Sequence, residues 1–405
     1  MTSRDEKGNG LYLPRTMEPS LQAALASFPA VLIDGPRASG KTTTARRYAN
    51  SVVAFPHDLD RVKVNPTHFL SNLEPPVLID EWQLAGTDFL WILKDLIDSD
   101  PQPGRFILTG SVEPASYGPT YPLTGRATRV MMRPMTLREL NGEGRKQGVI
   151  QLLGERRAIQ PTSGVVSTFT FADLFRTGFP AARNLSDPSM FLAGYADTVS
   201  ERGGEEGRDK TRLRRTMDVL AVLEGQSVPD ETIWEAADIN KRTWKSYEDI
   251  LTRTSVTGNL RSFESNRLSR VTRYPRRFYA DTALSLALAH MSPRDLDGDT
   301  TLARRYVESY TVAQVRPQAD ALGGTVYHLR TYSGGREVDT IIETPVGLIA
   351  VEVKTSARPS HTDAANLVWF RELFGQRFLG GILAHTGGDV WEMDDSIFAV
   401  PLGQL

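Results

Sequence analysis

Short apolar runs alternate with one clear helical pattern in the first part of the chain. Ala30–Asp34, Val77–Asp80 and Phe106–Thr109 are each mainly apolar and end in a polar residue. Asp88–Ser99, between the second and third runs, spaces its apolar residues as an amphipathic helix does. Strands that are buried on both faces of a parallel sheet read as continuous apolar runs. The pattern over residues 1–150 therefore predicts an α/β domain, with a parallel sheet covered by helices.

The pattern changes twice after residue 150. Residues 165–290 read mainly as helices, and residues 295–405 read as a helix followed by alternating strands. The expected elements of this last part are Leu302–Val315, Val326–Arg330, Glu337–Glu343 and Leu348–Lys354. We therefore expect three domains, because the chain is also too long for one ordinary hydrophobic core.

Composition narrows the class of protein. The chain has 405 residues, of which 40% are hydrophobic and 24% are charged, as in soluble globular proteins. No apolar run reaches the ~18 residues that a membrane-spanning helix needs, and the N-terminus lacks the apolar core of a secretion signal. We expect a cytoplasmic protein with no membrane partner. The absence of cysteine excludes disulfides, thiolate zinc sites and cysteine nucleophiles.

One loop carries the strongest chemical signal. Gly35-Pro-Arg-Ala-Ser-Gly-Lys41-Thr42 matches the pattern G-x-x-x-x-G-K-[ST] at every fixed position, between a predicted strand and a predicted helix. The glycines let main-chain N–H groups face phosphate oxygens, the lysine places an ammonium near the β- and γ-phosphates, and the threonine offers a hydroxyl to Mg²⁺. ATP and Mg²⁺ are therefore the expected cofactors. The residues expected at the nucleotide are Gly35, Pro36, Arg37, Ala38, Ser39, Gly40, Lys41, Thr42 and Thr43.

Two further strands end in residues that suit the same chemistry. Asp80 ends an apolar strand, and we expect it to hold Mg²⁺ through water. Glu81 follows directly and would polarise the attacking water. The next strand ends in hydroxyl groups, so Thr109 or Ser111 would sense the γ-phosphate between the other two strands.

These motifs together resemble a bacterial and archaeal family of AAA+-type ATPases whose members carry a C-terminal domain of poorly defined function. The resemblance extends to Leu123-Thr-Gly-Arg126 and to Arg133-Pro-Met-Thr-Leu-Arg-Glu139-Leu, in matching order and spacing. It implies that Arg126 is a phosphate-sensing or finger arginine, although an ordinary surface arginine fits the sequence equally well. Since such modules often complete their sites with a neighbour's arginine, a homo-oligomer is an open expectation.

The middle part of the chain contains a basic segment. From Lys241 to Arg277 there are ten Lys or Arg residues against three acids. Asp238–Asn240 reads as a turn before a helix that begins at Lys241, which is the order of a DNA-binding helix-turn-helix. The wing after it would carry Arg261, Arg267, Arg270, Arg273, Arg276 and Arg277. The family resemblance also implies a winged helix here. We expect contact with DNA through residues 241–277, and packing as a lid or against a neighbouring subunit is the alternative.

Two C-terminal strands bring charged residues together. Counting outward from a turn at Pro345-Val346 pairs Asp339 with Glu352, and directly paired residues share a face of the sheet. Lys354 points to that face as well. Carboxylates in this position bind Mg²⁺ or Mn²⁺, and an ammonium can stabilise charge on a scissile phosphate. The chain has 9 Lys against 38 Arg, so lysine here and in the glycine loop indicates a need for a compact ammonium.

This pattern resembles the D-x(n)-E-x-K core of the PD-(D/E)XK nuclease superfamily. Glu308 matches the further acid that the superfamily carries on a preceding helix, so the metal ligands implied by the resemblance are Glu308, Asp339 and Glu352, with Lys354 as the catalytic lysine. The fold class we expect is α/β: a P-loop AAA+ ATPase domain, a helical winged-helix segment and a restriction-endonuclease-like domain. The expected function is Mg²⁺-dependent ATP hydrolysis by a DNA-associated protein that cleaves phosphodiesters. An ATP-switched module that binds DNA or protein with a vestigial nuclease site, and a protein-remodelling ATPase, are the alternatives.

Overall fold

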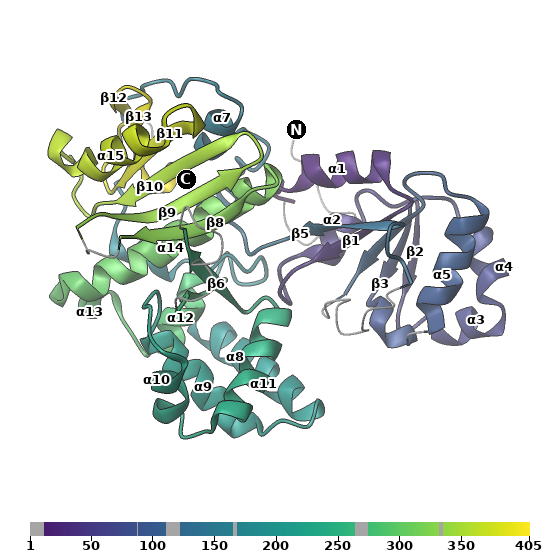
Figure 1. Ribbon diagram of the computed structural model, residues 1–405. Helices are drawn as coiled ribbons and strands as arrows, with labels where there is room; N and C mark the ends of the chain where they lie inside the picture. Colours follow the sequence, from purple (N-terminus) through teal and green to yellow (C-terminus); the bar gives the residue numbers. More distant parts are fainter. Residues whose placement is uncertain (1–11, 87, 111–121, 165–167, 264–273, 332–334) are drawn as a thin grey trace. The chain divides into compact units, whose positions relative to one another are not determined.

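The computed structural model describes residues 12–86, 88–110, 122–164, 168–263, 274–331 and 335–405 (Figure 1). The chain divides into two compact units. The N-terminal unit is Met17–Arg133 together with Arg253–Ser255, and the C-terminal unit is the described part of Met1–Thr16, Pro134–Thr252 and Val256–Leu405.

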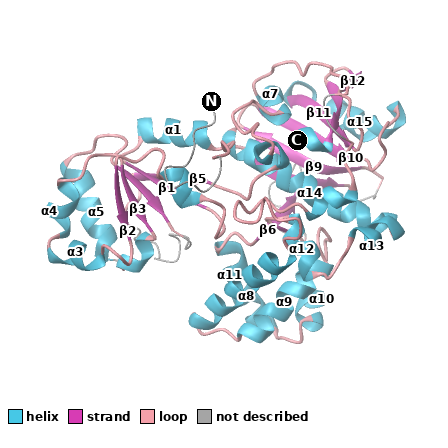
Figure 2. Cartoon of the chain, turned by 180° about the vertical axis from the view of Figure 1, so that it is seen from behind, coloured by secondary structure: helices cyan, strands magenta, loops and turns pink. Residues whose placement is uncertain are grey.

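A five-stranded parallel sheet forms the centre of the N-terminal unit. The strand order is β2-β3-β4-β1-β5, and every neighbouring pair is parallel. Figure 2 shows strands of this sheet as magenta arrows with α3, α4 and α5 beside them. The strands are β1 (Ala30–Asp34), β2 (Ser51–Ala54), β3 (Val77–Asp80), β4 (Phe106–Thr109) and β5 (Ala127–Met131). The parallel sheet and three of these strands confirm the prediction from apolar runs.

Helices pack on both faces of this sheet because alternate strand residues are apolar on both sides. Leu32, Ile79 and Leu108 belong to one buried cluster, and Val31 and Ile33 belong to another. The helices are α1 (Glu18–Ser27), α2 (Lys41–Ala45), α3 (Leu59–Val64), α4 (Pro66–Ser71) and α5 (Asp88–Ser99), with a 3-10 turn at Trp82–Ala85. The bounds of α5 agree with the predicted amphipathic helix.

Helices form the first part of the C-terminal unit. They are α8 (Ser189–Glu205), α9 (Lys210–Val222), α10 (Asp230–Ala236), α11 (Lys241–Arg253) and α12 (Thr282–Leu288). A turn joins α10 to α11, and the antiparallel hairpin of β6 (Thr257–Ser262) and β7 (Arg276–Tyr279) follows. Trp244, Tyr247 and Ile250 lie on one face of α11 and are buried among these helices. The order helix, turn, helix and hairpin is the one expected from the sequence.

The hairpin continues into an eight-stranded sheet with the order β12-β13-β11-β10-β9-β8-β6-β7. Strand β6 pairs in parallel with β8, so the helical part and the last part of the chain share one sheet. The remaining strands are β8 (Thr325–Arg330), β9 (Glu337–Thr344), β10 (Gly347–Val353), β11 (Phe378–His385), β12 (Trp391–Asp394) and β13 (Ile397–Pro401).

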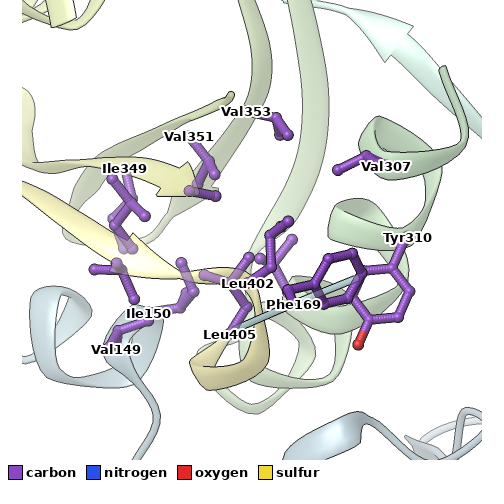
Figure 3. Packing of buried hydrophobic residues seen from close by; sticks show 14 of the residues in the cluster. Val149, Ile150, Phe169, Val307, Tyr310, Ile349, Val351, Val353, Leu402 and Leu405 are labelled. Carbon is purple, nitrogen blue, oxygen red and sulfur yellow. The ribbon is translucent and has the colours of Figure 1, made fainter. Parts of the chain in front are cut away.

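Two layers of helices cover this sheet. Val351 and Val353 of β10 pack with Val307 and Tyr310 of α14 (Thr300–Ala321), as Figure 3 shows. The opposite face packs against α15 (Ala365–Phe374). The other helices are α6 (Leu137–Leu140), α7 (Val149–Gly154) and α13 (Pro293–Gly298).

Residues 134–154 pack with the C-terminal unit. The main-chain N–H of Leu137 donates to Gln314 Oε1 at 2.7 Å, and that of Ile150 donates to Gln318 Oε1 at 3.1 Å. The expected domain boundary at residue 150 therefore lies about one helix later than the end of the compact N-terminal unit at Arg133. Among the described helices, none combines the length and the apolar character needed to span a membrane.

Candidate nucleotide site and C-terminal carboxylate cluster

The glycine loop joins β1 to α2 at the carboxyl end of the sheet. Gly35 has φ 146°, and a Cβ atom there would lie 2.0 Å from the main-chain oxygen of Met132. Gly40 has φ 96° and precedes the first residue of α2. Only glycine fits both positions without strain, so the fixed glycines of the motif follow from the backbone itself.

Lys41 turns back over this loop. Its Nζ donates to the carbonyl oxygens of Gly35 and Pro36, both at 2.8 Å, and the residue is 7% exposed. Burial lowers the pKa of Lys41 to about 8, against the raising effect of Glu81 and Asp34. A buried amine that has only neutral carbonyl oxygens as hydrogen-bond partners gains from an anionic partner, and a phosphate group is one.

Asp80, at the end of β3, accepts hydrogen bonds from side chains of two other segments. Its Oδ1 accepts hydrogen bonds from Thr42 Oγ1 at 2.8 Å and from Thr109 Oγ1 at 2.6 Å. The start of α2 and the ends of β3 and β4 therefore converge on one carboxylate. Ser111, the other predicted sensor, lies outside the described residues.

Glu81 takes an unusual backbone conformation. Its φ is 54°, in the left-handed region that costs a non-glycine residue free energy. Gln83, in the 3-10 turn, donates from Nε2 to Glu81 Oε2. The predicted catalytic carboxylate is therefore held by a neighbouring amide that the sequence interpretation missed, and the short spacing of the two residues was the available signal.

Arg126 lies at the other end of the sheet from the loop. Ala30 pairs with Ala127, while Asp34, next to the loop, pairs with Met131. Since strands rise about 3.3 Å per residue, more than 10 Å separates Arg126 from the phosphate loop of its own unit. Its guanidinium instead contacts Asp98, with Nη2 2.9 Å from Oδ2. A phosphate-sensing or finger role for Arg126, and the alternative of an ordinary surface arginine, both stay predictions, and this position places the side chain away from the phosphate loop of its own unit.

Two of the predicted DNA-contacting arginines are structural instead. Arg277 is buried, with Nη2 2.5 Å from Asp230 Oδ1 and 3.0 Å from Glu248 Oε1, and its guanidinium lies over the ring of Trp244. Arg276 is buried as well and forms ion pairs with two carboxylates of the C-terminal sheet region. Their charges are neutralised by these ion pairs inside the protein, so contact of residues 241–277 with DNA, which stays a prediction, would depend on other side chains.

The start of α11 keeps an exposed basic surface. Lys241 and Arg242 are exposed, and Arg261 is exposed on β6. Lys245 forms ion pairs with Asp230 at 2.7 Å and with a second acid on its own helix. Of the other predicted wing arginines, Arg267, Arg270 and Arg273 lie outside the described residues.

The hairpin register of the C-terminal strands follows the prediction. Glu343 pairs with Leu348, and the ladder runs to the pair of Thr340 and Val351. The next pair in this register is Asp339 and Glu352. The ladder ends at the pair of Thr340 and Val351, because Asp339 Oδ2 accepts the main-chain N–H of Val353 at 2.9 Å.

Asp339 affects two further carboxylates at this end of the hairpin. Burial raises the pKa of Asp339, and burial followed by the Asp339 charge raises the pKa values of Glu308 and Glu352 to about 7 each. Glu352 is 4% exposed; its Oε1 accepts from Asn366 Nδ2 at 2.8 Å, while its Oε2 is buried without a hydrogen-bond partner. The predicted acids therefore come together.

Basic groups of the same chain neutralise this cluster. Arg304 Nε lies 2.8 Å from Glu308 Oε1, and Arg276 Nη1 lies 3.4 Å from Glu308 Oε2. Lys354, the predicted catalytic lysine, lies near Glu352 and pairs with Asp363 at 3.8 Å. Across the described ranges, no group of three or more His, Cys, Asp or Glu side chains is arranged to hold a metal ion. The sequence analysis missed Arg304, although its position four residues before Glu308 on one helix was a usable signal.

Similarity to known proteins agrees with the loop geometry for the N-terminal unit. Residues 27–141 match the family model of an AAA domain, and residues 172–295 and 304–405 match models of two domains of unknown function, DUF8612 and DUF4143. The glycine loop, Asp80 with its two threonine partners, and the AAA match together define a P-loop ATPase domain of the AAA type.

Two bacterial proteins are similar to almost the whole length of the chain. The chain is 25% identical over 395 residues to the uncharacterized proteins Rv2008c of Mycobacterium tuberculosis and Mb2031c of Mycobacterium bovis, covering 95% of this chain and 82% of each relative. Among solved structures, a Walker-type ATPase of Pyrococcus abyssi is 15% identical, covering 68% of this chain and 98% of that one with a TM-score of 0.41.

Proposed function

We propose that the protein hydrolyses ATP in a Mg²⁺-dependent reaction at the loop between β1 and α2. One observation carries the proposal: the hydroxyls of Thr42 and Thr109 converge on Asp80 at the end of the sheet where Lys41 folds over the glycine loop. The donors and the carboxylate have the chemistry that a triphosphate and a hard cation require.

Each residue has a distinct part in this proposal. Lys41 exchanges its hydrogen bonds to loop carbonyl oxygens for contacts with the β- and γ-phosphates, and the main-chain N–H groups of residues 35 and 37–43 surround the phosphates. Thr42 and Asp80 would hold Mg²⁺, which when bound neutralises charge that develops on the phosphates. Glu81 orients the attacking water, Thr109 or Ser111 senses the γ-phosphate, and Arg126 acts as a finger in a neighbouring subunit of a homo-oligomer.

The test is phosphate release by the Lys41→Ala variant. We expect turnover to fall at least ~100-fold, because the variant loses charge stabilisation in the transition state. Lys63→Ala removes a matched lysine from the exposed surface of α3 and should leave turnover unchanged. Thermal unfolding of both variants checks that the fold persists. Unchanged turnover in folded Lys41→Ala refutes the proposal.

A second proposal concerns DNA, and the exposed basic start of α11 supports it. The helix, turn, helix and hairpin order suits a winged helix whose second helix approaches DNA with Lys241 and Arg242. The Lys241→Ala, Arg242→Ala variant should bind DNA more weakly and reduce the salt dependence by about one unit of log–log slope for each lost phosphate contact. Lys210→Ala, on α9, is the control. Equal slopes for all proteins contradict the proposal.

The C-terminal cluster supports a nuclease-like proposal. Glu352 Oε2 is buried without a partner beside Asp339, and a carboxylate oxygen in that state gains from a cation. We propose that residues 304–405 form a PD-(D/E)XK-like domain. Its acids Glu308, Asp339 and Glu352 would have to move together to hold Mg²⁺ or Mn²⁺, because among the described residues no such group is arranged to do so, and Lys354 would stabilise the phosphate. Cleavage of single- or double-stranded DNA or RNA that Asp339→Ala abolishes would support it.

Other outcomes favour the alternative functions. Salt-dependent binding to DNA without cleavage, under any combination of ATP and metal, favours an ATP-switched binding module with a vestigial site. Absence of any binding to DNA or RNA at low salt favours a protein-remodelling ATPase. The same purified protein therefore distinguishes three functions by two measurements, cleavage and binding.

A further inference from the structure

Gln83 contacts the proposed catalytic carboxylate through one half of its amide group. Its Nε2 donates to Glu81 Oε2, whereas its Oε1 is buried without a hydrogen-bond partner. A general base must lie within hydrogen-bond reach of the water that it activates. The amide of Gln83 occupies one oxygen of Glu81 and fixes the direction in which the carboxylate points. Gln83 therefore restricts how Glu81 can turn toward such a water molecule.

A short turn brings these two side chains together. Glu81 has φ 54°, and the main-chain N–H of Leu84 donates to the carbonyl oxygen of Glu81 at 3.0 Å. The 3-10 turn Trp82–Ala85 begins at this point, and the side chain of Trp82 is buried in the core of the N-terminal unit. Because Trp82 ties the turn to the core, the backbone of Gln83 has little freedom, and its side chain is the part that can move.

Gly110, directly after the proposed sensor Thr109, leaves the space that Gln83 occupies. A Cβ atom at Gly110 would overlap Gln83 Oε1 and would lie 2.9 Å from Trp82 Nε1. The φ of Gly110 is not in the left-handed region, so its backbone conformation does not require glycine. The requirement is for space, because any side chain at this position would push Gln83 away from its contact with Glu81.

The observed arrangement of Gln83 and Glu81 carries two costs in free energy. A buried acceptor without a partner lacks the hydrogen bond that it would make with water. The left-handed backbone of Glu81 is also unfavourable for a residue with a side chain. A rotation that moves Gln83 Oε1 into solvent would remove the first cost and break the contact with Glu81. A small displacement of the neighbouring residues is therefore enough to release the contact.

We propose that Gln83 restrains Glu81 and so slows ATP hydrolysis, and that Gly110 keeps the restraint in place by leaving room for Gln83. The inference rests on the proposed ATP hydrolysis, in which Glu81 orients the attacking water. It adds that the end of β4 controls the restraint. Thr109 and Gly110 are adjacent in the chain, so a shift of Thr109 toward a γ-phosphate would be passed to Gln83.

The experiment is a double-mutant cycle on the full chain, with phosphate release measured at saturating ATP and affinity measured with a fluorescent ATP analogue. We expect Gly110→Ala to raise turnover by up to about tenfold, the factor that corresponds to one hydrogen bond to a charged group. The affinity for the analogue should stay unchanged. In the Gln83→Ala background, Gly110→Ala should have no further effect, because the atom with which its Cβ collides is absent.

Two comparisons isolate the contact between Gln83 and Gly110. The new Cβ also approaches Trp82, but that approach is the same with and without the Gln83 side chain. Only the difference between the two backgrounds therefore reports on Gln83. Gly194→Ala, on α8, is the matched control, since a Cβ there meets no neighbouring atom within 4 Å. Its turnover should equal that of the wild type.

The outcomes separate the restraint from ATP hydrolysis itself. Turnover that needs Lys41, together with an equal effect of Gly110→Ala in both backgrounds, refutes the role of Gly110 and leaves ATP hydrolysis standing. Turnover that stays equal or falls in Gln83→Ala refutes the restraint. Absence of Lys41-dependent turnover in every folded variant refutes ATP hydrolysis, and the restraint with it. If Gly110→Ala does not fold, Gln83→Asn decides, because its shorter side chain keeps the amide but loses the contact; turnover that does not rise then refutes the restraint.

Discussion

Glu224 joins four elements of the C-terminal unit through one buried carboxyl group. It follows α9 and accepts hydrogen bonds from Ser285 Oγ of α12 at 3.0 Å, from the main-chain N–H of Tyr279 in β7 at 3.1 Å, and from Ser309 Oγ of α14. It is fully buried, and burial raises its pKa from 4.5 to about 7 in spite of these bonds. Of the charged groups that affect it, Arg316 lowers the pKa.

This pKa makes the stability of the unit depend on pH. The unfolded carboxyl loses its proton near pH 4.5, whereas the folded carboxyl keeps it to about pH 7. Between these values the unfolded state binds fewer protons, so stability falls as pH rises. The protonated carboxyl group makes its full contribution to the free energy of unfolding below pH 4.5, and this contribution is lost above pH 7. At 1.36 kcal/mol for each pH unit, the loss is on the order of 3 kcal/mol.

Glu224→Gln imitates the protonated group and should remove the dependence. Its amide oxygen can accept from Tyr279, and its NH₂ group can donate to a serine oxygen. In urea unfolding followed by tryptophan fluorescence, the variant and the wild type should be equally stable at pH 4.5. At pH 8.5 the variant should be more stable by about 2–3 kcal/mol. Glu235→Gln, on the exposed surface of α10, is the control and should follow the wild type.

Two results would refute this reasoning. A constant difference between Glu224→Gln and the wild type across the pH range would mean that the carboxyl of Glu224 does not exchange its proton in this window. A wild type that gains stability over the variant as pH rises would mean that the folded state prefers the carboxylate, against the cost of its burial.

Three further predictions concern the two units. Gly35→Ala should weaken binding of a fluorescent ATP analogue at least about tenfold. The new Cβ would collide with the carbonyl oxygen of Met132 and strain the loop by about 1–3 kcal/mol. Binding of wild-type strength would contradict this. Arg277→Ala should lower the free energy of unfolding by about 1–3 kcal/mol, since it removes a buried guanidinium from two partly buried carboxylates that keep Lys245 as a second partner. A loss well below ~1 kcal/mol in urea unfolding would show that the pairs of Arg277 contribute little. Gln83→Ala should release Glu81 and raise ATP turnover by up to about tenfold, with unchanged ATP affinity. This factor corresponds to the loss of one hydrogen bond to a charged group, worth ~1.5 kcal/mol. Slower turnover would instead give Gln83 a positioning role.

Features that depend on neighbouring residues were predictable from the sequence. The glycine loop, the strand before it and Asp80 are short local patterns, and each is present. The register of β9 and β10 was predictable for the same reason, since a two-residue turn leaves little freedom in how Asp339 and Glu352 pair.

Features that depend on distant partners were not predictable. Arg276 and Arg277 belong to a basic segment, but their carboxylate partners are up to 61 residues away in the chain. The position of Arg126, at the end of the sheet away from the phosphate loop, became clear only once β5 was known to lie beside β1. The N-terminal domain boundary depended on Gln314 and Gln318 in the same way, because amides of a remote helix accept from residues near 137 and 150.

The pairing of β6 with β8 limits how this protein can be divided. The match to a domain of unknown function begins at residue 304, after β6 and β7. A fragment cut at that point would keep β8 but lose the strand beside it, and β8 would become a bare edge with unpaired N–H and C=O groups. Such edges recruit strands from other chains and promote aggregation. Strands β6 and β7 therefore protect this edge of the C-terminal sheet, and an isolated C-terminal fragment needs residues from about 256 onward to keep β8 covered.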